Sequence, residues 1–150
     1  MAAGVDTETA QRLRVAVGRL ARVLRSTEAS LAADLTPTRV AVLLNTVRNG
    51  PIRLSEVAEQ EGLNPTLLSR TVATLAQDGL LTRTADESDR RSAWLDATAA
   101  GRELAERIRA ERTRALDIAM SELTHEDRVL IEAALPALEE LSHHLRQGNP

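Results

Sequence analysis

Apolar residues recur at helical spacing along most of the chain, and this periodicity predicts a mainly helical protein. Residues 8–33 read as one long amphipathic helix, whose apolar positions are Leu13, Val17, Leu20, Leu24 and Leu31. Thr36 and Pro37 form a helix-start signal, because Thr caps the first turn and Pro fits the first helical position. The sequence therefore predicts a second helix over 37–49.

Two shorter helices follow with only three residues between them. Residues 54–61 have the apolar spacing of a short helix, which Gly62 ends. Asn64 and Pro65 then start another helix, predicted over 65–78. Two helices joined by such a turn form a helix-turn-helix pattern. On the second of them, Leu68, Val72 and Leu75 share one face, while Thr66, Ser69, Arg70 and Ala73 share another.

A short β-hairpin is predicted directly after the helix-turn-helix. Residues 80–85 and 92–97 have the composition of two strands, and the charged stretch 86–91 between them is the hairpin loop. A helix-turn-helix followed by a charged hairpin is a winged helix. We expect this winged-helix lobe to occupy residues 37–97.

Two long helices close the chain. Thr98 starts a helix that runs to about residue 121, and Thr124 starts another, in which Pro136 is expected to cause a kink or a break. Because helices 8–33 and 98–147 carry too much apolar surface to remain in solvent, we expect them to form a dimerisation lobe with a second copy. The predicted fold class is mainly α with a small β-hairpin wing, in one domain over 1–150.

Composition and charge limit how the chain can bind nucleic acid. The chain of 150 residues has a formal net charge of −3, and its 19 basic residues are all arginine. The segment 53–91 contains five basic and seven acidic residues, so it is not a basic patch on average. Binding to nucleic acid must therefore depend on where the arginines point, and on doubling them by dimerisation.

The sequence does not support an enzyme, a metalloprotein or a membrane protein. The chain has no cysteine, so thiolate metal sites and thiol redox chemistry are excluded. The glycines are scattered and form no phosphate loop, and His125, His143 and His144 have poor spacing for a metal site. We therefore expect no catalysis, no metal and no cofactor. There is no signal-peptide pattern and no apolar run approaching ~20 residues, which predicts a cytoplasmic protein without a membrane span.

Two stretches resemble the MarR family of transcriptional regulators, and the resemblance covers about residues 10–146. They read LTPTRVAVLLNTVRNGPIRLSEVAEQEGLNPTLLSRTVATLAQDGLLTR and DESDRRSAWLDATAAG. The family's wing has Asp-x-Arg, a short strand and then Leu-Thr-x-x-Gly. Asp89 and Arg91 match the first part, and Thr98 and Gly101 match the last, whereas Ala97 replaces the Leu.

The resemblance implies a winged helix that binds double-stranded DNA through two elements. It places Arg91 in a minor groove, where a narrow groove attracts arginine, with Asp89 orienting it. Arg90 lies beside it and could reach a phosphate. The alternative for this loop is a solvated turn with local ion pairs.

The helix 65–78 is the expected recognition helix, which contacts DNA through Pro65, Thr66, Ser69 and Arg70. Two alternatives remain open for its side chains. Arg70 could instead pair with a nearby carboxylate, and Leu67 could belong to the core or touch a thymine methyl group.

The family implies a homodimer that reads a pseudo-palindrome and responds to a small molecule. Its ligand pocket would lie between the first, second and fifth predicted helices, and an organic anion there could bind Arg22 or Arg25. The function expected is a DNA-binding transcriptional regulator, most simply a repressor. The alternatives are a winged-helix adaptor for other proteins and a DNA-binding protein without a ligand.

Overall fold

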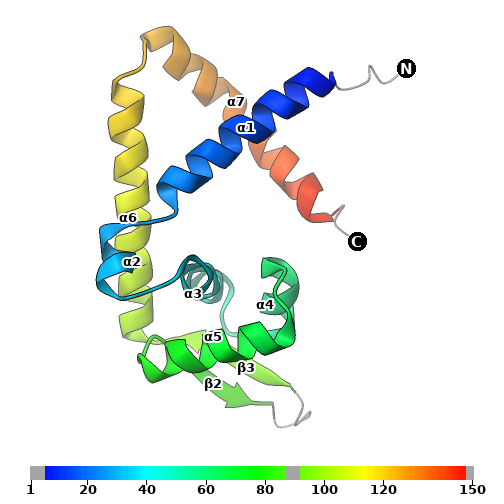
Figure 1. Ribbon diagram of the computed structural model, residues 1–150, viewed down its shortest axis with the longest axis vertical. Helices are drawn as coiled ribbons and strands as arrows, with labels where there is room; N and C mark the ends of the chain where they lie inside the picture. Colours follow the sequence, from blue (N-terminus) through cyan, green and yellow to red (C-terminus); the bar gives the residue numbers. More distant parts are fainter. Residues whose placement is uncertain (1–5, 87–91, 148–150) are drawn as a thin grey trace. The chain divides into compact units, whose positions relative to one another are not determined.

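A computed structural model describes residues 6–86 and 92–147, and it has the predicted fold class: mainly α-helical with a small antiparallel sheet (Figure 1). The chain divides into two compact units, residues 1–112 and residues 113–150. In the described part of the chain, no helix is long and apolar enough to cross a membrane.

The first predicted helix is in fact two helices. α1 spans Thr7–Leu24 and α2 spans Glu28–Ala32, so the prediction of a single helix over 8–33 is wrong. The break is stabilised by a reciprocal cap, in which Thr27 N–H donates to Ser30 Oγ (3.0 Å) and Ser30 N–H donates to Thr27 Oγ1 (3.1 Å). The Glu111 carboxylate also accepts from Ala29 N–H (3.1 Å), which fixes α2 against a distant part of the chain.

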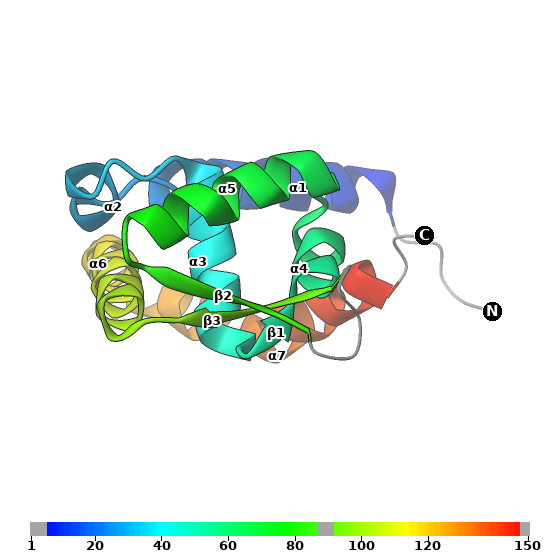
Figure 2. The ribbon, with the colours of Figure 1, turned by 90° about the horizontal axis from the view of Figure 1, so that it is seen from below.

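Three helices pack together in the winged-helix lobe, and the last two of them form the helix-turn-helix. α3 spans Pro37–Asn49, α4 spans Leu54–Glu61 and α5 spans Pro65–Gln77, and they pack together with the sheet (Figures 1 and 2). Burial of apolar side chains supplies the main stabilisation of such a lobe. Their fully buried apolar side chains include Val42, Leu43, Val57, Leu68, Val72 and Leu75.

The sheet has three strands instead of the predicted two. β1 spans Ile52–Arg53, β2 spans Leu81–Ala85 and β3 spans Ala93–Ala97, in the antiparallel order β1-β3-β2 (Figure 2). In the register, β3 pairs its Trp94 with Arg53 of β1 and with Thr84 of β2. Alternate residues of β3 are buried, so one face of the hairpin is held on the core.

Two long helices complete the chain. α6 spans Ala99–Ser121 and begins in the first unit, and α7 spans His125–Gln147 in the second. Thr124 caps α7 as predicted, since its Oγ1 accepts from Asp127 N–H (3.1 Å). Of the two outcomes predicted at Pro136, a kink or a break, the break does not occur, since Pro136 lies inside α7, which continues past it.

Candidate nucleic-acid interface

The start of α5 is fixed by the turn that precedes it. Gly62 has φ 62°, a left-handed conformation that favours glycine, and Leu63 N–H donates to Ala58 O (2.9 Å). The Asn64 side chain then accepts from Leu67 N–H (2.8 Å), which caps the helix as predicted. On its inner face, Leu68, Val72 and Leu75 are fully buried. Because this inner face packs on the core, the residues on the opposite face of α5 point outward.

The outward face of α5 carries the predicted recognition residues. Pro65, Thr66 and Arg70 are exposed, and Ser69 is half-buried. Among the described residues, Arg70 forms no ion pair, so the alternative of a local carboxylate partner has no support there. Leu67 is 43% exposed, which removes the alternative that it belongs to the core. This face is available for contact with the edges of bases.

The predicted wing contacts lie outside the described residues. Asp89, Arg90 and Arg91 belong to residues 87–91, whereas the two strands that carry them are described. At the loop end of the hairpin, Asp86 N–H donates to Ser92 O (3.1 Å). This hydrogen bond closes the hairpin on its loop side.

Three side chains meet at this loop end of the hairpin, one from β1, one from β3 and one from the residue that follows β2. Asp86 is 8% exposed, and its Oδ2 accepts from Trp94 Nε1–H (3.1 Å) and lies 3.3 Å from Arg53 Nη2. The Arg53 guanidinium also lies over the Trp94 ring, 5.1 Å from its centroid. Sequence reasoning missed Arg53 in this cluster, because its partners lie more than thirty positions away.

The Thr98-x-x-Gly101 motif connects the hairpin to α6. Thr98 Oγ1 donates to Gly79 O (2.6 Å) and accepts from Gly101 N–H (3.0 Å), while Thr98 N–H donates to Leu80 O (3.1 Å). A Cβ on Gly101 would collide with the Leu80 carbonyl oxygen. The motif thus holds the first turn of α6 directly against the chain between α5 and β2.

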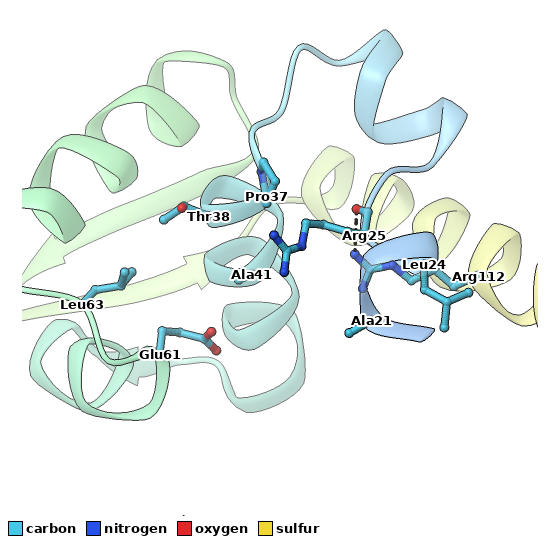
Figure 3. A pocket seen from close by; sticks show the side chains of 9 residues that line it. All are labelled: Ala21, Leu24, Arg25, Pro37, Thr38, Ala41, Glu61, Leu63 and Arg112. Atoms are coloured by element: carbon cyan, nitrogen blue, oxygen red, sulfur yellow. Dashed lines mark hydrogen bonds between the residues drawn. The ribbon is translucent and has the colours of Figure 1, made fainter. Parts of the chain in front are cut away.

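A pocket of about 500 Å³ lies beside the helix-turn-helix, within the first unit (Figure 3). Its lining comes from the end of α1, the start of α3, the α4–α5 turn and α6: Ala21, Leu24, Arg25, Pro37, Thr38, Ala41, Glu61, Leu63 and Arg112. Of the two arginines predicted for a ligand, Arg25 lines this pocket and Arg22 does not.

Arg112 is the arginine that sequence reasoning missed here. Its Nη2 donates to Arg25 O (3.4 Å), drawn as a dashed line in Figure 3, and its Nε is buried without a hydrogen-bond partner in the described part of the chain. Burial lowers the pKa of the Arg112 guanidinium below its ordinary value, although arginine remains charged at neutral pH. A half-buried cationic side chain with one buried, unpaired N–H donor favours an anionic partner.

Glu61 connects the pocket to the helix-turn-helix. Its carboxylate lines the pocket from the end of α4, and it accepts from Asn45 Nδ2 of α3 (2.7 Å). Asn45 is 8% exposed and also donates to Gln60 Oε1 (3.0 Å). A molecule that drew Glu61 away would disturb the bond between α3 and α4.

Comparisons with known proteins agree with this geometry. Residues 35–93 match the MarR family model. The chain is 25% identical over 123 residues to YwhA of Bacillus subtilis (strain 168), an uncharacterized HTH-type transcriptional regulator, covering 79% of this chain and 88% of that protein.

Solved structures share the fold, and two of them illustrate the similarity. One is RV1404 from Mycobacterium tuberculosis, with a TM-score of 0.80, 20% identity, and coverage of 94% of this chain and 97% of the other. The second is NadR in complex with 4-hydroxyphenylacetate, with a TM-score of 0.63, 22% identity, and coverage of 92% and 96%.

Proposed function

The chain belongs to the MarR family of DNA-binding transcriptional regulators, and on that premise we propose that it represses transcription by binding a pseudo-palindromic operator as a homodimer. The observation that carries the proposal is the outward face of α5, where Thr66 and Arg70 are exposed on a helix whose opposite face is buried. Such a helix fits the major groove, where arginine reads guanine.

The apolar surfaces of both units support the homodimer. On α1, Val17, Leu20 and Val23 are exposed, Val23 by 75% of its surface. On α7, Val129, Leu130 and Leu145 are exposed, Leu130 by 67%. Large exposed apolar patches mark interaction surfaces, and a second copy is the simplest partner that covers both. Two copies of α5 would then contact half-sites about 34–36 Å apart.

The pocket beside α3 supports regulation by a small organic anion. It contains Arg25, the half-buried Arg112 and one carboxylate, Glu61, so its arginines outnumber its acids. NadR, which shares the fold, binds 4-hydroxyphenylacetate, a small carboxylate. We assign Arg25 and Arg112 to the carboxylate of the ligand. Arg22, which does not line the pocket, no longer belongs to this proposal.

Two experiments test the function directly. Selection from a random duplex library should enrich an inverted repeat whose half-sites are about one helical turn apart. Light scattering at micromolar concentration should give twice the chain mass, and Leu20→Glu should shift it toward one chain. Recovery of no DNA would instead favour a winged-helix adaptor, and a wild-type mass of one chain would refute the dimer.

A further inference from the structure

A second groove lies on the winged-helix lobe, between the helix-turn-helix and the hairpin. It has a volume of about 330 Å³ and is lined by Arg53, Leu54, Ser55, Ala58, Pro65, Leu68, Ser92 and Ala93. Among these lining residues Arg53 is the one with a charged side chain, and no carboxylate is among them. Arg53 is therefore the one charged residue of this lining, and it is paired with Asp86 next to the groove.

The groove lies between the two elements that are expected to contact DNA, α5 and the hairpin. Pro65 is the first residue of α5, Ala93 is the first residue of β3, and Ser92 directly precedes β3. Figures 1 and 2 place α4 and the start of β3 at the same end of the lobe. If α5 lies in a major groove and the wing reaches the adjacent minor groove, the sugar–phosphate strand that separates these two grooves must cross between α5 and the hairpin.

We propose that Arg53 is a further DNA-contacting residue, which binds a backbone phosphate of this intervening strand. The inference rests on the proposed function and adds a residue to it. Phosphate contacts of this kind set the position of a protein on the duplex, while base contacts specify the sequence. Ser55 and Ser92 supply hydroxyl donors in the same groove.

The surroundings of Arg53 hold its guanidinium at the groove. Its ion pair with Asp86 and its stacking on Trp94 restrict the side chain, which is still 44% exposed. The ion pair uses Nη2, and a guanidinium has five N–H donors in a planar fork. Holding the side chain in advance reduces the entropy lost on binding. Glu56 is close, but its carboxylate accepts from Arg53 N–H (3.2 Å) at the start of α4.

The salt dependence of binding tests the proposal. Each phosphate contact contributes about 0.9 to the slope of log K against log salt, so Arg53→Gln should reduce the slope of a dimer by about 1.8. Affinity for the operator and for scrambled DNA should fall by the same factor, about tenfold or more. Arg53→Lys retains the charge and should keep the wild-type slope.

Arg102→Gln is the matched control. Arg102 is 52% exposed and pairs with Asp96 (3.0 Å), so it also forms an Arg–Asp pair, but at the end of β3 away from the groove. Its slope should equal that of the wild type. An unchanged slope in Arg53→Gln, or a loss confined to the operator, would overturn the proposal.

A second measurement works with the wild-type protein and does not depend on a variant folding. Neutral methylphosphonates are placed one at a time along the operator. We expect weaker binding of the wild type when the neutral group lies on the strand between the α5 contacts and the wing contacts. No weakening at those positions would refute the contact. If the wild type binds no DNA at all, the proposed function itself fails.

Discussion

Gly101→Ala should destabilise the protein, because Gly101 is buried where the first turn of α6 meets the chain after α5. A Cβ there would collide with the Leu80 carbonyl oxygen and lie 3.4 Å from Leu43 Cδ1. The carbonyl cannot retreat freely, since it accepts from Thr98 N–H. Overpacking destabilises a protein by about 3 kcal/mol at the upper end of its usual range. The higher helix propensity of Ala offsets roughly 1 kcal/mol of this loss. The net expected loss is about 2 kcal/mol.

Gly18→Ala is the matched control for this substitution. It makes the same chemical change in α1, where a Cβ would meet nothing within 4 Å. It should stabilise the protein by about 0.5–1 kcal/mol, because glycine within a helix costs that much relative to alanine. Urea denaturation of both variants, followed by circular dichroism at equal protein concentration, gives the two free energies of unfolding. If Gly101→Ala were as stable as the wild type, the packing described for the Thr98-x-x-Gly101 motif would be wrong.

Two further predictions concern the wing and the pocket. Arg91→Ala should weaken operator binding without changing the melting temperature, most strongly when the flanking base pairs are A·T-rich, because a narrow minor groove attracts a guanidinium; equal affinity on both kinds of flank would make the loop a solvated turn. Small aromatic carboxylates such as 4-hydroxyphenylacetate should raise the melting temperature of the wild type. Arg112→Gln should remove that increase while Arg22→Gln retains it, and thermal-shift titrations that show the same increase in all three proteins would exclude the pocket as the site.

Local signals were enough to predict the helix-turn-helix. Thr36-Pro37 and Asn64-Pro65 each place a capping side chain before a proline, and both caps form the expected hydrogen bonds. Helix periodicity likewise identified the buried face of α5, and through it the outward face. These features depend on residues within a few positions of one another, so one sequence contains the information needed.

Features that depend on distant residues were missed. The break after α1 relies on the Thr27–Ser30 cap, which sits inside an apolar pattern that continues through it, and on Glu111 from α6. β1 has only two residues and exists because β3 pairs with it. Arg53 and Arg112 look like ordinary surface arginines in the sequence, and only the folded chain brings them to Asp86 and to the pocket.

Whether α5 reads an operator is best tested by measuring sequence preference in the wild type and in Arg70→Ala. The measurement compares affinity for the selected inverted repeat with affinity for a scrambled duplex of equal composition, at fixed salt. The wild type should prefer the repeat by at least about 10³-fold. Arg70→Ala should lose about 1–3 kcal/mol of that preference per contacted base pair, with its affinity for scrambled DNA less affected. Equal preference in the two proteins would contradict the assignment of Arg70 as a base-reading residue, and no preference in the wild type would contradict the account as a whole.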